Sequence, residues 1–146
     1  MYQRILVPLE NSVYDAGILK HVCQLARLCN SSIVLIHVAD GWAARHINSL
    51  TLRESEEIQA DRAYLDGLCE KLHAEGFVAD SILAGGDPAT EITAAADREK
   101  CDLIAMATHG HRGLQDVIYG TTANTVRHRT MVPVLMVRGA PPGPKH

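Results

Sequence analysis

The sequence predicts a single doubly wound α/β domain, in which five parallel strands form one sheet with helices on both faces. Short apolar runs alternate along the chain with longer segments that have the apolar periodicity of a helix, the pattern of successive βαβ units. The run "SIVLIHVA" at 32–39 is apolar without alternation, as expected for a strand covered on both faces. No internal repeat breaks this series, which therefore indicates one domain.

The first half of the chain contains two predicted strands, Arg4–Pro8 and Ser32–Ala39, and two predicted helices. The first helix is expected to have Ser12 as its N-cap, with Asp15 three residues later as the other member of a capping box. After an irregular segment at 40–50, the second helix is expected over 51–75, with Gly76 as its C′ residue. Apolar residues at helical spacing are expected to face the sheet: Ile18, Val22, Leu25, Ala26, Cys29, Ile58, Leu65, Leu68 and Leu72.

The second half continues the alternation, with strands expected at 77–85, 102–108 and 133–137. The helix after 77–85 has Asp87 as its expected N-cap and Pro88 at its first position, where the missing N–H of proline costs nothing. The last helix is expected to start near Thr121 and to end at about Arg129. The domain is expected to cover 1–138, and the Gly/Pro-rich segment 139–146 is expected to be a flexible tail.

Composition and charge favour a soluble cytoplasmic protein. The 14 Lys and Arg residues against 17 Asp and Glu give a net charge of −3, which argues against nucleic acid or an anionic membrane as the partner. No apolar run approaches the ~18 residues of a membrane span, and the N-terminal sequence lacks a signal-peptide layout. Without a CxxC pair, the cysteines are expected to be free thiols packed as small apolar residues: Cys23, Cys29, Cys69 and Cys101.

Four other side chains are weighed as functional candidates. His109 and His111 form an H-x-H pair without a nearby Cys or carboxylate, which is an incomplete metal site. His37 lies in an apolar strand and is expected to be a hydrogen-bonded core histidine. Trp42 follows that strand and is equally compatible with a lid over a cleft and with core packing.

The stretch "ATHGHRGLQDVIYGTT" at 107–122 follows the strand 102–108 and is the main candidate for a ligand site. Ligands of doubly wound sheets bind at the carboxyl ends of the strands, where the winding reverses. Gly110 and Gly113 permit a tight turn that brings bare N–H groups close to a ligand, and Arg112 could reach a terminal phosphate.

The end of this stretch has the chemistry of an anion site. Gly120, Thr121 and Thr122 are expected to open a helix, whose unpaired N–H groups and positive dipole end suit a phosphate. From the residues alone, a phosphate cradle and a simple turn with a helix cap remain equally open. A Walker A loop, a Rossmann fingerprint after the first strand and a G-x-S-x-G nucleophile elbow are all missing from the sequence. A response regulator is excluded as well, because no phospho-acceptor Asp ends the third strand.

The same stretch resembles the nucleotide signature of the universal stress protein family, G-x2-G-x9-G-[ST]. Gly110, Gly120 and Thr121 match its last three fixed positions, and Ala107 stands where its first glycine would be. Five other segments resemble the family in the right order: "ILVPLENS", "LIHVAD", "GGDPATEI", "DLIAMATHG" and "VPVLMV". The resemblance implies the adenine-nucleotide alpha-hydrolase-like fold with strand order 3-2-1-4-5.

The resemblance also implies an ATP site. Glu10 matches the acid that contacts the adenosine in ATP-binding members, where it is usually Asp, and Asn11 stands in place of the usual glycine. The backbone near Val38 would meet the adenine, and a divalent cation, Mg²⁺ or Mn²⁺, would bridge the phosphates. The expected nucleotide-binding set is Pro8, Glu10, Val38, Ala107, Gly110, Arg112, Gly113, Gly120, Thr121 and Thr122.

What the resemblance implies for function is an ATP-binding regulator in stress adaptation, with at most slow ATP hydrolysis because no positioned base is evident. The family also has members that bind no nucleotide, and the alternative is a dimeric interaction module of that kind. The apolar run Val134–Val137 would form an exposed edge strand unless a second copy covered it, which predicts a homodimer through this strand. A further protein partner is left open.

Overall fold

The structure is a computed structural model that describes residues 1–39, 52–109 and 114–139, with the backbone alone described at 52–55, 109, 114–121 and 139. Five strands, paired in parallel, form one sheet in the order β3-β2-β1-β4-β5. The predicted doubly wound sheet with strand order 3-2-1-4-5 is therefore confirmed. The elements are β1 Arg4–Pro8, α1 Asp15–Cys29, β2 Ser32–Ala39, α3 Leu52–Ala74, β3 Ala79–Gly85, α4 Pro88–Arg98, β4 Leu103–His109, α5 Leu114–Arg129 and β5 Val134–Gly139.

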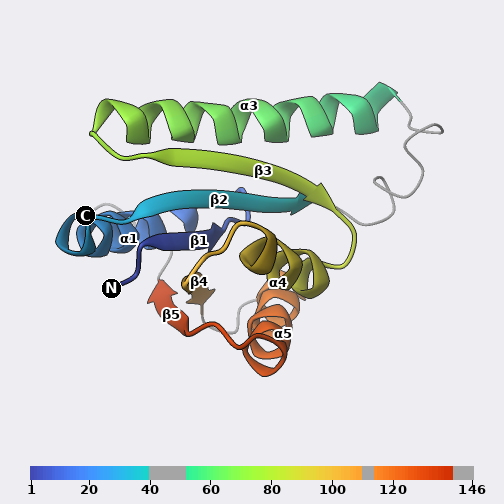
Figure 1. Ribbon diagram of the computed structural model, residues 1–146. Helices are drawn as coiled ribbons and strands as arrows, with labels where there is room; N and C mark the ends of the chain where they lie inside the picture. Colours follow the sequence, from blue (N-terminus) through green and yellow to red (C-terminus); the bar gives the residue numbers. More distant parts are fainter. Residues whose placement is uncertain (40–51, 110–113, 140–146) are drawn as a thin grey trace, which may run out of the picture.

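Helices cover both faces of the sheet, as Figure 1 shows, with α3 running alongside β3 and with α4 and α5 together on the other side. Successive side chains of a strand point to opposite faces, so each buried strand feeds two cores. Ile5 and Val7 of β1 pack with α1 and α3, whereas Leu6 packs with α4 and α5. This two-sided burial explains why the strands read as continuous apolar runs.

Two helix boundaries carry the capping residues that the sequence predicts, one at the start of α4 and one after the end of α3. The Asp87 carboxylate caps α4 by accepting a hydrogen bond from the Thr90 N–H at 3.0 Å. Hydrogen bonds from the Thr90 hydroxyl and N–H hold the pKa of Asp87 below its usual value. Gly76 follows α3 with φ +93°, a left-handed conformation that glycine adopts without steric cost.

The largest corrections to the predicted boundaries fall at four places, and the other predicted bounds agree to within one residue. α1 begins at Asp15 rather than directly after Ser12, although the Asp15 carboxylate does accept from the Ser12 N–H at 3.3 Å. The last helix, expected near Thr121, begins at Leu114. β3 begins at Ala79 instead of 77, and β5 ends at Gly139 instead of 137.

Three of the four cysteines pack as predicted for small apolar residues, whereas Cys29 is only partly buried. Cys23, Cys69 and Cys101 are buried, and no cysteine is in a disulfide. Burial raises the pKa of each of these three thiols, that of Cys101 to about 11, so they stay protonated at neutral pH.

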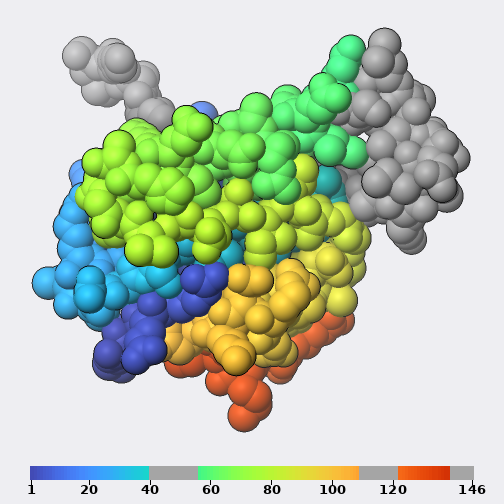
Figure 2. Space-filling view, turned by 45° about the horizontal axis from the view of Figure 1, so that its top comes forward, coloured from blue at the N-terminus to red at the C-terminus, as the bar shows by residue number. Residues whose placement is uncertain are grey.

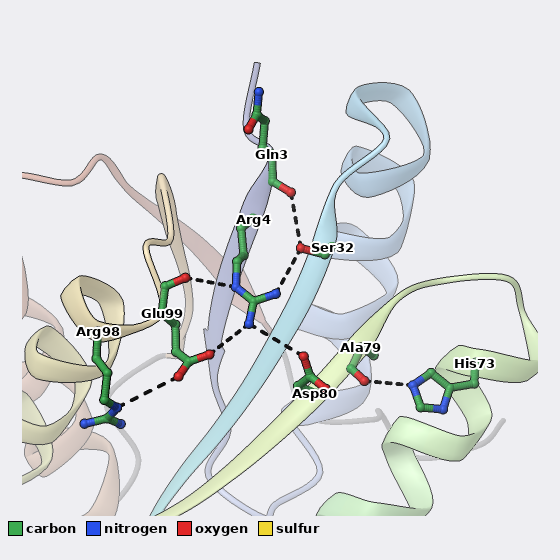
Figure 3. A network of polar contacts seen from close by, with 8 residues as sticks. All are labelled: Gln3, Arg4, Ser32, His73, Ala79, Asp80, Arg98 and Glu99. Atoms are coloured by element: carbon green, nitrogen blue, oxygen red, sulfur yellow. Dashed lines mark hydrogen bonds and ion pairs between the residues drawn. The ribbon is translucent and has the colours of Figure 1, made fainter.

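Arg4 ties together several elements at the amino end of the sheet (Figure 3). Its guanidinium donates to the carbonyl and carboxylate oxygens of Glu99, after α4, at 3.0 and 2.8 Å. It also donates to the Ser32 hydroxyl of β2 at 3.3 Å and lies 3.6 Å from the Asp80 carboxylate of β3. One side chain thus links β1, β2, β3 and the α4–β4 turn.

Asp102 completes this end of the sheet and gives it a pH dependence. Its carboxylate accepts hydrogen bonds from the backbone N–H groups of Gln3 and Arg4, at 2.9 and 3.0 Å. The carboxylate is exposed, and its small loss of hydration pushes the pKa of Asp102 up, but these N–H groups outweigh that effect and leave the pKa below the usual value. The carboxylate therefore stabilises the fold fully above the unfolded-state pKa of ~3.9, and that contribution is lost as pH falls through the lower folded-state pKa.

We expect Asp102→Asn to lower the free energy of unfolding by about 1 kcal/mol at pH 7, because the carboxylate is exposed and its hydrogen bonds compete with water. Urea unfolding between pH 7 and 2.5 should show this difference shrinking below about pH 4. Asp66→Asn, at an exposed position on α3, is the matched control and should change little. A difference that stayed constant over this pH range would contradict the role given to the Asp102 charge.

Candidate functional site

A cleft of about 460 Å³, counted to where it opens to solvent, lies at the carboxyl ends of the strands. β1 and β4 are neighbours in the sheet, and the winding reverses between them, which is where doubly wound folds bind ligands. The cleft is lined by Pro8, Leu9, Glu10, Ile36, Val38, Pro88, Ile92, Met106, Ala107 and Thr122.

Half of the nucleotide-binding set predicted from the sequence meets in this cleft: Pro8, Glu10, Val38, Ala107 and Thr122. Gly110, Arg112 and Gly113 lie outside the described residues, as do Trp42 and His111. Sequence reasoning missed Leu9, Ile36, Pro88, Ile92 and Met106. A signal for two of them was available, because the helix predicted to start at Pro88 follows the third strand and so begins at the same edge of the sheet.

The helix α5 corrects the predicted phosphate cradle. It begins at Leu114, so Gly120 and Thr121 lie beyond its first turn, where backbone N–H groups bond to carbonyl oxygens of the same helix. The expected row of unpaired N–H groups at 120–122 is therefore wrong. Thr122 still contributes to the cleft, as a buried side chain on its wall.

Asp15 fixes the loop that carries Glu10. Its carboxylate is only 2% exposed and accepts hydrogen bonds from the Glu10 N–H at 3.0 Å and the Tyr64 hydroxyl at 2.6 Å, besides that from Ser12. Burial and the hydrogen bond to Asp15 raise the pKa of Tyr64, so the phenol stays a donor at neutral pH. The β1–α1 loop is thus fixed by Asp15 of α1, which is itself hydrogen-bonded to Tyr64 of α3.

Glu10 lines the cleft from this loop. Its Oε2 accepts a hydrogen bond from the Ser12 hydroxyl at 3.0 Å. The next residue, Asn11, has φ +60°, a left-handed conformation that Asn tolerates better than most residues other than glycine. Its side-chain N–H donates to Asp61 of α3 at 2.7 Å. The substitution of Asn for the usual glycine therefore fits the backbone and adds a tether.

His37 is a core histidine with partners on both ring nitrogens. Its Nδ1 lies 2.9 Å from the Leu9 carbonyl oxygen, and since a carbonyl only accepts, Nδ1 carries the proton and donates. Its Nε2 lies 3.6 Å from the Asp61 carboxylate. The prediction of a hydrogen-bonded core histidine is confirmed, and β2, α3 and the β1–α1 loop are joined through it.

The described lining of the cleft is mainly apolar. Among the described lining residues, Glu10 is the one ionisable side chain, and Thr122 supplies a hydroxyl on otherwise mainly apolar walls. The part of the chain that the structure describes contains no group of three His, Cys, Asp or Glu residues placed to bind a metal ion. None of the helices in the described ranges combines the length and apolar character that crossing a membrane requires.

The family model of the universal stress proteins matches residues 1–138. The chain belongs to the universal stress protein family. Among curated relatives, it is 28% identical to universal stress protein MJ0577 of Methanocaldococcus jannaschii, over 94% of this chain and 96% of the relative. It is 27% identical to universal stress protein YxiE of Bacillus subtilis, over 94% of this chain and all of the relative.

Solved structures share the fold. That of MJ0577 superposes with a TM-score of 0.79 at 26% identity, covering 96% of this chain and 98% of the other. A universal stress protein in complex with cAMP gives 0.68 at 19% identity, covering 94% and 97%. One from Archaeoglobus fulgidus in complex with dAMP gives 0.68 at 18% identity, covering 93% and 98%. Adenine-nucleotide alpha-hydrolase-like architecture is thereby established for this chain.

Proposed function

We propose that the cleft binds an adenine nucleotide, with ATP and Mg²⁺ or Mn²⁺ as the expected form, and that the protein is a cytoplasmic regulator in stress adaptation. The observation that carries the proposal is the cleft itself, an apolar slot at the switch point of the sheet with Glu10 and Thr122 in its lining.

The described residues fit the adenosine part of such a ligand. Val38, Pro88 and Ala107 offer partly exposed apolar surface to a flat ring, and the Glu10 carboxylate is an acceptor for ribose hydroxyls. Thr122 offers a hydroxyl toward a phosphate. Since the described residues provide no cluster of metal-binding side chains, phosphate oxygens would supply much of the coordination of the cation. The cAMP and dAMP complexes of two relatives support an adenine-type ligand.

Regulation is proposed instead of turnover because a phosphoryl-transfer enzyme must position an attacking water and neutralise developing charge. The described lining has one carboxylate, Glu10, and no Lys, Arg or His. We expect slow hydrolysis at most, with the nucleotide changing the shape of the protein or its choice of partner.

We expect isothermal titration of the protein with Mg-ATP to give one site per chain, and Val38→Trp to weaken it at least about 30-fold, or ~2 kcal/mol, by filling the slot. The matched control is Val78→Trp, which places the same indole at a largely exposed position before the start of β3. Normal binding by Val38→Trp would place the nucleotide elsewhere.

The alternative is a family member that binds no nucleotide and acts as an interaction module. The observation in its favour is the early start of α5, which encloses Gly120 and Thr121 within a helix. Wild-type protein that stays unchanged at millimolar ATP would support this alternative and overturn the nucleotide proposal.

The proposal includes a homodimer through β5. This strand lies at the edge of the sheet, and Val134, Leu135 and Val137 are only partly buried, while Met136 is 41% exposed. A second copy paired along this edge would cover both the apolar side chains and the unpaired backbone groups. Sedimentation at about 50 μM should give a dimer, and a monomer would overturn this part of the proposal.

A further inference from the structure

The two helix pairs differ in how they cover the sheet. α4 and α5 pack directly against each other, whereas α1 and α3 approach each other little and leave a groove of about 1100 Å³ between them, counted to its open mouth. In Figure 2, α3 lies in green along one side of the molecule. Leu19 of α1 and Leu68 and Leu72 of α3 line the groove, so its inner surface is apolar.

The groove follows the whole length of α1. Val13, at one end, is 60% exposed. At the other end a second hollow shares Arg27 and Glu75 with the groove and is lined by Val78, which is 66% exposed. α1 has 15 residues, so this surface is about 22 Å long, enough for four turns of another helix.

The charge of the groove is opposite to that of the chain. Three cations line it, Lys20 and Arg27 from α1 and Lys71 from α3, against the single acid Glu75. The whole chain, in contrast, has a net charge of −3. Every charged side chain on the exposed surface of α1 is basic or a histidine, because its one acid, Asp15, is buried.

We propose that this groove is a docking surface for an amphipathic helix of a partner protein that has an apolar stripe flanked by carboxylates. The apolar floor would bury the stripe, and the basic walls would pair with the carboxylates and disfavour basic helices. Arg27 is held ready for this role, since its guanidinium stacks 4.9 Å from the ring centroid of Phe77. The surface is separate from the nucleotide cleft, so this proposal does not depend on ATP binding.

The test uses three synthetic 18-residue helical peptides with the same leucine stripe and with Glu, Gln or Lys at the flanking positions. Fluorescence anisotropy with the full-length protein should show the Glu peptide binding with a Kd below about 100 μM and the Lys peptide at least tenfold more weakly. The double variant Lys20→Glu/Lys71→Glu should reverse this order. Arg127→Glu, on α5 at the opposite face of the sheet, removes the same kind of charge and should leave the order unchanged.

Further measurements distinguish a partner helix from other occupants of the groove. Circular dichroism must show that the double variant is folded, and Lys20→Gln/Lys71→Gln, which removes charge without reversing it, should give intermediate affinities. Failure of the Glu peptide to bind at about 1 mM, or equal binding of all three peptides, would overturn the proposal. Tighter binding of dodecanoate than of the Glu peptide would also overturn it, because the groove would then be a fatty-acid site. Dissociation of a wild-type dimer into monomers by the double variant would overturn it as well, because the groove would then be an interface between copies of this chain.

Discussion

Asp15→Ala is expected to lower the free energy of unfolding by about 3–4 kcal/mol, because three donors lose one buried, charged acceptor. The donors are the N–H groups of Glu10 and Ser12 and the hydroxyl of Tyr64. The phenol lies at a partly buried position and would be left with an unmet hydrogen-bonding group, whereas the loop N–H groups can recover part of the loss from water. The loop that carries Glu10 would also lose its fixed position, so nucleotide affinity should fall together with stability.

Urea unfolding at pH 7 measures this effect, and two variants bracket it. Asp15→Asn keeps the shape and one acceptor oxygen and should lose about half as much, while Asp66→Ala, at an exposed position, should lose under about 0.5 kcal/mol. Tyr64→Phe removes one of the three donors, so its effect and that of Asp15→Ala should not add in the double variant. A loss below about 1 kcal/mol for Asp15→Ala would show that the carboxylate is not what holds the loop.

The fold was predictable because burial on both faces of a parallel sheet leaves a direct mark in the sequence. β1 and β2 were predicted to the residue. The apolar run of β1 lies between Arg4 and Pro8, and that of β2 begins at Ser32 and ends just before Asp40. β3 was placed two residues early. Phe77 continues the apolar run but is bonded to α3 through its N–H to the Leu72 carbonyl oxygen, so it belongs to the end of the helix.

The start of α5 was hidden by its composition. Glycines at 110, 113 and 120 favour a loop, and a Gly-Thr-Thr sequence is typical of a helix start. In the structure Gly120 is an interior residue of the helix, a position that costs about 1 kcal/mol relative to alanine and that neighbouring contacts must offset. Local helix propensity does not predict this early start, because it takes no account of the packing of α5 against the sheet through Ala123 and Val126.

The sequence predicts some of the residues that line the cleft, but not the contacts that fix the loop beside it. Pro8, Val38 and Ala107 were placed correctly because the ends of neighbouring parallel strands meet at one edge of the sheet. The contact of His37 and Asn11 with Asp61 could not be predicted, since Asp61 lies on α3 and no periodicity relates it to the loop. Tyr64 is one turn further along the same helix, so α3 supports the site although none of its described side chains lines the cleft.

Because α3 supports the β1–α1 loop, weakening its packing should affect both the stability of the fold and the order of that loop. Among the leucine side chains of α3 that the structure describes, Leu65 is the one that is fully buried, and it packs into the core between the sheet, α1 and α3. Leu65→Ala is expected to lower the free energy of unfolding by about 3–4 kcal/mol, from the lost apolar burial and the cavity left behind. Asp61 and Tyr64 lie within one turn before Leu65 on the same helix, and they contact Asn11 and Asp15. The variant should therefore also speed hydrogen exchange at the Glu10 and Ser12 amides.

Leu28→Ala makes the same chemical change at a position on α1 that is 85% exposed, and it should alter stability by no more than about 0.5 kcal/mol. Urea unfolding followed by circular dichroism compares the two variants, and hydrogen exchange read by mass spectrometry follows peptides from the β1–α1 loop. A Leu65→Ala protein that lost stability but exchanged the loop amides at the wild-type rate would show that α1 alone holds the loop. Faster exchange in the loop, ahead of global unfolding, is the result expected if the hydrogen bonds from Tyr64 and Asn11 transmit the packing of α3 to the cleft.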